Sequence, residues 1–149
     1  YLRAFGPATA ADIRAWSGLS GLRDPLERLR PRLRTFRDEA GRELLDTDDG
    51  VLPDPDTPAP VRFLPAFDNT VLAYRHRGRV IDPAYRALSV DATRFVLVDG
   101  RVAATWRWTK PGPRAGASVS VEPLRPLRRG EAAAVDAEAH RMEAFLNGT

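Results

Sequence analysis

The feature that most limits how this chain can fold is an acidic, proline-rich stretch near its middle, Asp46–Pro60. Its sequence, DTDDGVLPDPDTPAP, cannot continue a regular helix or an inner strand, because proline lacks a backbone N–H and fixes its own φ angle. Its negative charge also predicts that it avoids phosphates. We therefore expect two units, residues 1–50 and 62–149, joined by a Pro/Asp-rich linker over residues 51–61.

The first unit begins with the start and stop signals of three short helices. A Gly-Pro pair ends the first of them, and Thr9 with Asp12 has the spacing of a capping box at the start of the second. The pair Asp24-Pro25 is typical of the N-cap and first residue of the third. The predicted helices cover residues 1–5, 10–17 and 24–33.

The rest of the first unit predicts a two-stranded flap. Pro31 should kink or shorten the third helix, and two extended segments follow at Arg34–Asp38 and Arg42–Asp46. Three helices and a flap are the order of a winged helix, whose third helix often enters the major groove of DNA. Four arginines there are candidate DNA contacts, with a purely structural role as the alternative: Arg28, Arg30, Arg32 and Arg34.

A second basic cluster closes the stretch Arg62–Arg79. Its apolar start predicts a buried strand that breaks at Pro65, and Asp68 is placed to cap a short helix beginning near Thr70 and carrying Tyr74. Asp68 could instead position a water or a flipped nucleotide. The cluster at the end of this helix either clamps phosphates or is a solvated helix end: Arg75, His76, Arg77 and Arg79.

Further along, Asp99-Gly100 predicts a two-residue hairpin turn between the strands Arg94–Val98 and Arg101–Trp108. Regular pairing places Phe95 and Leu97 on one face with Val102, Ala104, Trp106 and Trp108, and Val96 and Val98 on the other face with Ala103 and Arg107. The two tryptophans could stack on bases or lie in the core. Two more candidate DNA contacts lie at the end of this hairpin: Arg107 and Lys110.

The C-terminal part adds a strand over Ser118–Glu122 and a helix over Glu131–Leu146. An apolar stripe of Val135, Ala139, Met142 and Leu146, with Phe145 beside it, should pack this helix on the sheet, leaving His140 at the surface. The predicted fold class is α+β: a winged-helix unit, then a small β-barrel-like sheet closed by a C-terminal helix.

The composition narrows the classes of function. The sequence has a pI near 9.9, and its 23 basic residues include one lysine. Arginine suits bidentate contact with phosphate and base edges, although a G+C-rich genome produces the same bias. Without cysteine, and with two distant histidines, we expect no disulfide, metal or other cofactor. No membrane span or signal peptide is evident, so we expect a cytoplasmic protein, and an initial Tyr1 suggests a piece of a longer one.

Several segments together resemble the winged-helix DNA glycosylases of the AlkZ and YcaQ type. They are YLRAFGP (residues 1–7), ADIRAWSG (11–18), LPAFD (64–68), YRHRGR (74–79) and VLVDGRVAATW (96–106). The resemblance implies tandem winged helices followed by a small β-barrel, binding of double-stranded DNA, and in some members removal of alkylated or crosslinked bases.

The family's catalytic motif is a glutamine, an apolar residue, then glutamine or aspartate, in an N-terminal part of the protein. This chain has no glutamine, so no catalytic residue is carried over, and we expect the chain alone to excise no base. The sequence thus predicts a DNA-binding C-terminal portion of such a protein. The alternative is a non-enzymatic winged-helix regulator or protein-interaction module.

Overall fold

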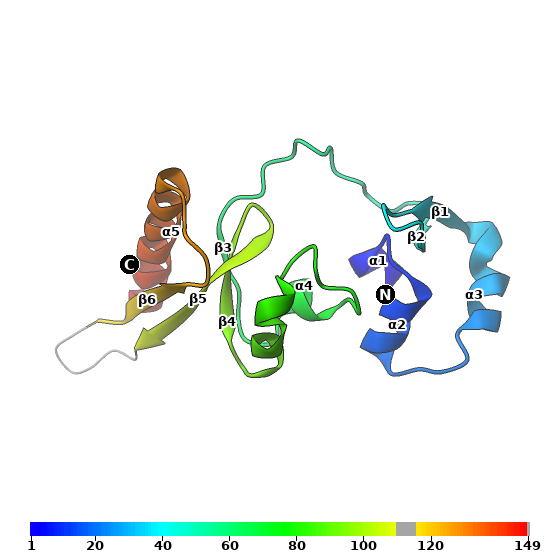
Figure 1. Cartoon of the computed structure of the whole chain (residues 1–149), viewed down its shortest axis with the longest axis horizontal. Coiled ribbons are helices and arrows are strands. Elements are labelled where there is room, and N and C mark those ends of the chain that lie inside the picture. Colours follow the sequence, from blue (N-terminus) through cyan, green and yellow to red (C-terminus); the bar gives the residue numbers. More distant parts are fainter. Residues whose placement is uncertain (110–115, 149) are drawn as a thin grey trace. The chain divides into compact units, whose positions relative to one another are not determined.

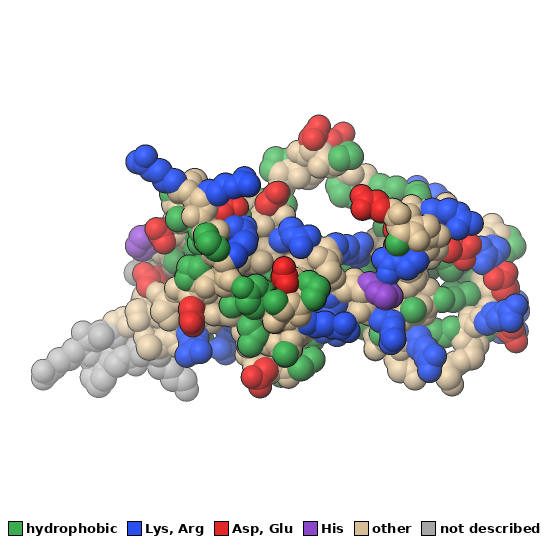
Figure 2. Space-filling view, viewed as in Figure 1, with side chains coloured by type: hydrophobic (Ala, Val, Ile, Leu, Met, Phe, Trp, Pro, Cys, Tyr) green, Lys and Arg blue, Asp and Glu red, His purple; other side chains and the backbone are tan. Residues whose placement is uncertain are grey.

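The computed structural model describes residues 1–109 and 116–148, which form a mixed α+β structure (Figure 1). The chain divides into two compact units. The first comprises Tyr1–Thr57 and Asn69–Arg77, and the second comprises Pro58–Asp68 and Gly78–Thr149. Residues 48–61 contain no helix or strand, as their prolines predict, and Figure 2 shows acidic side chains on this loop.

The first unit has the predicted order of helices and strands. Its elements are α1 (Leu2–Phe5), α2 (Ala10–Ser17), α3 (Arg23–Leu29), the 3₁₀ turn η1 (Arg30–Arg32), β1 (Leu33–Arg37), β2 (Glu43–Thr47) and, later in the chain, α4 (Asn69–Leu72). The capping box of Thr9 and Asp12 is present, so that prediction is confirmed. Pro31 lies in the 3₁₀ turn and shortens α3, also as predicted.

Two details of the first unit differ from the prediction. Helix α3 begins at Arg23, so Asp24 and Pro25 lie inside its first turn rather than at its cap. A proline is tolerated there because the first turn's N–H groups have no partner within the helix. Helix α4 ends at Leu72, so Tyr74 and the basic cluster follow it in irregular chain instead of lying on its last turn.

A two-stranded antiparallel sheet closes the first unit. Strands β1 and β2 pair with Leu33 opposite Thr47. The residue Ala8, between α1 and α2, adds a short third segment by exchanging backbone hydrogen bonds of 2.9 and 2.8 Å with Leu45. Both of these residues are buried, so the flap is fixed to the helices by its centre and not only by its ends.

The second unit is built on a four-stranded antiparallel sheet in the order β3-β4-β5-β6. Its elements are β3 (Arg62–Phe63), the 3₁₀ helix η2 (Pro83–Val90), β4 (Arg94–Val98), β5 (Arg101–Thr109), β6 (Ser118–Pro123) and α5 (Arg129–Asn147). The expected barrel-like closure is wrong, since no pairing joins β3 to β6 within residues 1–109 and 116–148. The edge strand β3 has two residues before Pro65, so it has few backbone groups left to pair.

Helix α5 packs on one face of this open sheet (Figure 1). Val135 is 2% exposed within a core that includes Val96 and Trp106. Two side chains of the helix also hold the start of β6, since Glu143 accepts the N–H of Val119 at 2.7 Å and Asn147 accepts that of Ala117 at 2.7 Å. The helix therefore packs on the sheet as predicted, with Phe145 and His140 exposed.

A β-bulge changes which residues of the hairpin share a face. Asp99 and Gly100 both have positive φ, as the two-residue turn requires, and Leu97 pairs with Val102. The register then shifts by one, so Val96 pairs with Ala104, Phe95 with Thr105, and Arg94 with Trp106. The predicted faces are therefore wrong beyond the bulge: Trp106 joins Val96 and Val98 in the core under α5.

No helix among the described residues is long and apolar enough to cross a lipid bilayer.

Candidate nucleic-acid interface

The segment after α4 is held against α1 and α2 by hydrogen bonds from two tyrosines. The Tyr1 hydroxyl donates to the carbonyl oxygen of Ala73 at 2.7 Å, and the Tyr74 hydroxyl donates to that of Phe5 at 2.9 Å. The rings of Tyr1, Phe5, Tyr74 and Trp16 form one cluster, with centroids 5.2 to 6.4 Å apart. These contacts fix where the chain enters its basic cluster.

A buried carboxylate then orients the first basic residues. One oxygen of Asp12 accepts the backbone N–H of Arg75 at 2.8 Å, and the other accepts the N–H and the hydroxyl of Thr9 at 2.9 and 2.6 Å. Burial alone would raise the pKa of Asp12, but the hydrogen bonds from Thr9 and from the backbone of Arg75 and His76 outweigh it and lower that pKa. The acidic residue of the α2 capping box is thus also the anchor of the basic segment.

This anchoring leaves the leading basic side chains at the surface. Arg75 and His76 are exposed, whereas Arg77 is partly buried and donates through Nε to the carbonyl oxygen of Tyr74 at 3.0 Å. Arg79 belongs to the second unit, where its own carbonyl oxygen accepts a hydrogen bond from Arg101. The structure therefore brings Arg75, His76 and Arg77 together on the first unit and assigns Arg79 to the other.

The arginines of the third helix and first strand divide into two pairs. Arg30 forms ion pairs with Glu27 and Glu43 at 2.8 and 3.0 Å, and the hydrogen bonds that it donates to these carboxylates raise the pKa of its guanidinium further. Arg34 donates to the carbonyl oxygens of Thr47 and Gly50 and lies 3.6 Å from the buried carboxylate of Asp46. Both side chains therefore serve the fold of the first unit.

The other pair of arginines is directed to solvent. Arg28 and Arg32 are exposed, and neither forms an ion pair or a side-chain hydrogen bond with any other described residue. Since the two pairs alternate along the chain, a sequence pattern alone does not separate them. Two of the acidic partners, Glu43 for Arg30 and Asp46 for Arg34, lie on β2, so only the folded structure distinguishes the two pairs.

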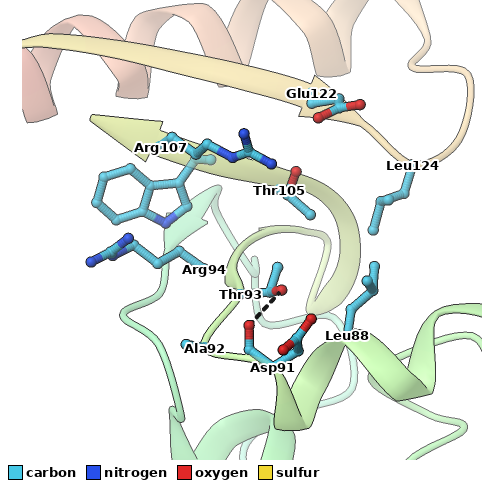
Figure 3. Close-up of a pocket in the computed structure, with 10 residues that line it drawn as sticks. Leu88, Asp91, Ala92, Thr93, Arg94, Thr105, Arg107, Glu122 and Leu124 are labelled. Carbon is cyan, nitrogen blue, oxygen red and sulfur yellow. Dashed lines mark hydrogen bonds between the residues drawn. The ribbon is translucent and has the colours of Figure 1, made fainter. Parts of the chain in front are cut away.

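Arg107 lies in the second unit, at a cavity of about 440 Å³ between the end of η2 and strands β4, β5 and β6 (Figure 3). Arg94 lines the same cavity, with its guanidinium 5.8 Å from the centre of the Trp106 ring. Trp106 is 7% exposed and donates through its indole nitrogen to the carbonyl oxygen of Leu64 at 2.8 Å, so it is a core residue. Lys110 lies outside the described residues.

Sequence reasoning missed two residues of these sites. Arg94 was overlooked because its pairing with Trp106 depends on the bulge, although an arginine at the start of a strand beside an aromatic-rich strand is a usable signal. The sequence predicts Asp12 as the capping-box partner of Thr9, but nothing local reveals its bond to Arg75. Asp68 immediately precedes α4, the position of an N-cap. Within residues 1–109 and 116–148, no three His, Cys, Asp or Glu side chains are grouped to hold a metal ion.

The whole chain can be compared with known proteins. Over 98% of its length it is similar in structure to the Streptomyces sahachiroi DNA glycosylase AlkZ, with a TM-score of 0.73 and 23% sequence identity. The chain spans 40% of that protein. Among curated proteins, none shows a significant match. Residues 1–145 match the family described as DNA glycosylase AlkZ-like, and the chain therefore belongs to the AlkZ-like DNA glycosylase family.

Proposed function

We propose that this chain binds double-stranded DNA as one portion of an AlkZ-like protein, with its first unit acting as a winged helix. The observation that carries the proposal is the Asp12 carboxylate, which anchors the backbone of Arg75 and leaves Arg75 and His76 exposed. Phosphate contacts supply most of the affinity of proteins for DNA, and exposed arginines on a fixed backbone are suited to make them. The family assignment supports the same conclusion.

A second surface of the first unit supports this function. Arg28 and Arg32 project from α3 and η1, the elements that correspond to the recognition helix of a winged helix. The remaining candidates from the sequence, Arg79, Arg107 and Lys110, belong to the second unit or lie outside the described residues. We therefore assign the main DNA contacts to Arg28, Arg32, Arg75, His76 and Arg77.

The test is a titration of a labelled duplex with the chain at several salt concentrations. Replacing Arg75 and Arg77 together with alanine should weaken binding and flatten the dependence of log K on log salt by about one unit per lost contact. The matched control is Arg129→Ala with Arg141→Ala, which removes the same charge from α5. Equal effects of the two double variants would mean that only net charge matters, and absence of duplex binding by the wild type would end the proposal.

Base removal is proposed to require parts of the protein outside this chain, since the chain spans 40% of AlkZ and contains no glutamine. A glycosylase must hold an extruded nucleotide and stabilise the reacting sugar, which needs polar groups at fixed positions. After heating, a duplex with an N7-alkylated guanine should therefore show no more strand breaks with the chain than without it. Strand breaks above the protein-free control, lost in Asp68→Ala, would place the active site within these residues.

A further inference from the structure

The cavity beside Arg107 is lined by polar side chains that the protein itself does not neutralise (Figure 3). Two are cations, Arg94 and Arg107, two are carboxylates, Asp91 and Glu122, and one is the hydroxyl of Thr105. Across the described part of the chain, no ion pair and no side-chain hydrogen bond joins any of these five to another group. Charged groups that line one cavity without pairing indicate a ligand that carries partners for both signs.

The backbone fixes these groups around the cavity. Thr105 and Glu122 are directly paired between β5 and β6, and Arg107 follows Thr105 by two residues, on the same face of its strand. On the opposite wall, Ala92 has a φ of 47°, a left-handed conformation that is unfavourable for alanine. This turn joins η2 to β4, and the Thr93 hydroxyl closes it by donating to the Asp91 carbonyl oxygen at 3.3 Å.

The size and accessibility of the cavity fit a small molecule. Its volume of about 440 Å³ lies within the range of small-ligand sites, which is roughly 300–1,000 Å³. Asp91, Arg107 and Glu122 are exposed, whereas Thr105 is 9% exposed. Leu88 and Leu124 supply apolar surface on its sides. The cavity thus offers a ligand both charged and apolar contacts.

We propose that this cavity binds a single nucleotide whose base carries an exocyclic amino group. The guanidinium of Arg107 suits a phosphate, because arginine binds phosphate oxygens through parallel N–H donors, and Arg94, whose guanidinium lies against the Trp106 ring, adds positive charge to the same cavity. The carboxylates of Asp91 and Glu122 suit the amino group of cytosine, adenine or guanine, since carboxylates accept hydrogen bonds from such groups. Free phosphate would meet the two carboxylates without compensation, and thymine has no amino group to offer them.

This inference deepens the proposed function and rests on it, because it names a nucleotide of DNA as the ligand of the second unit. A nucleotide reaches such a cavity when it is unstacked from its neighbours, at a strand end or beside damage. The two proposals are tested separately. Duplex binding is read from the salt titration above, whereas the cavity is tested with mononucleotides that form no duplex.

The experiment is an NMR titration of the isotope-labelled chain with the four deoxynucleoside monophosphates and with inorganic phosphate. The reporters are the backbone amides of Asp91 and Thr93 and the indole N–H of Trp106, because all three residues line the cavity. The nucleotides with amino-bearing bases should shift these signals saturably, at affinities at least about tenfold above those of thymidine monophosphate and phosphate. Equal binding of thymidine monophosphate or of phosphate would overturn the inference, as would unchanged reporters with every nucleotide.

Two substitutions separate the roles of the charges. Glu122→Gln keeps the size of the side chain and one acceptor oxygen but removes an anion, so with Asp91 still present it should reduce the preference over thymidine monophosphate. Arg107→Ala should weaken all four nucleotides. The matched controls on α5, Asp136→Asn and Arg129→Ala, remove the same charges from exposed positions away from the cavity and should change neither affinity nor preference. A control variant that reproduces either effect would show that binding follows net charge alone, and the site would then be rejected.

Discussion

The carboxylate of Asp12 accepts the backbone N–H of Arg75 at 2.8 Å, although 63 positions separate the two residues in the sequence. The same carboxylate caps the start of α2 through Thr9. The buried carboxylate of Asp12 therefore stabilises the start of α2 and also holds the backbone at Arg75. Loss of this carboxylate should lower both the stability of the fold and the affinity for DNA.

The first prediction follows from this bond. Replacing Asp12 with alanine leaves the N–H groups of Thr9 and Arg75 without their acceptor, which should cost about 1–3 kcal/mol of unfolding free energy. Affinity for duplex DNA should fall as well, because Arg75 loses its fixed position. Urea unfolding and the duplex titration measure the two effects. Asp24→Ala, which removes an exposed carboxylate from α3, is the control, and an equal loss in both variants would contradict the role of Asp12.

The second prediction concerns pH. Hydrogen bonds from Arg125 and from the backbone of Arg128 lower the pKa of Glu131 from 4.5 to about 2. Because the folded pKa is depressed, the unfolded chain binds more protons between these values. The stability that Glu131 contributes is then present above pH 4.5 and lost as the pH falls toward 2.

Glu131→Gln should accordingly flatten the dependence of unfolding free energy on pH in that window. Glu138→Gln removes a carboxylate that also pairs with an arginine on α5, Arg141, and serves as the control. Unfolding by denaturant at a series of acidic pH values gives the slopes. If Glu131→Gln kept the wild-type slope, the ion pair between Glu131 and Arg125 in the wild type would contribute too little to the unfolding free energy to be measured.

The third prediction tests the packing around the buried Asp46. A Cβ atom at Gly50 would lie 2.3 Å from Oδ2 of this carboxylate, and Asp46 is 2% exposed, so it has little room to move. We expect Gly50→Ala to lower the unfolding free energy by about 1–3 kcal/mol. Gly130→Ala is the matched substitution, since its Cβ would meet open space in the first turn of α5. Thermal melts that show equal losses would indicate that Asp46 is not fixed.

The fourth prediction separates the two pairs of arginines around α3. Replacing Arg28 and Arg32 with alanine should weaken DNA binding and leave the melting temperature close to that of the wild type. Replacing Arg30 and Arg34 should lower the melting temperature, because Glu27, Glu43 and Asp46 lose their partners. Parallel melts and duplex titrations of both double variants provide the comparison, and the reverse pattern would show that the inward-bonded pair faces the DNA.

Local signals predicted much of the fold. The capping box at Thr9, the stop at Pro31 and the hairpin at Asp99-Gly100 each depend on residues within a few positions of one another, so the sequence alone identifies them. The apolar stripe of α5 is equally local and correctly predicted a helix packed on the sheet.

What the sequence did not predict depends on distant contacts. The partners of Arg30 and Arg34 lie across the flap, and the acceptor for the N–H of Arg75 is in a different helix. The sheet has an open edge because β3 is only two residues long before Pro65. Which side chains of β5 face the cavity depends on the β-bulge between β4 and β5. None of these leaves a periodic pattern, because each is fixed by tertiary packing.

The bulge between β4 and β5 has a consequence for how this cavity can vary. Regular pairing from the Asp99-Gly100 turn would place Thr105 opposite Arg94; the extra residue advances β5 by one and places Thr105 opposite Phe95 instead. Side chains alternate along a strand, so one added or deleted residue exchanges everything beyond it between the core face and the cavity face. Relatives that differ by a single insertion at this point would present a different set of groups to a ligand. The number of residues in β5 thus decides which of its side chains face the cavity.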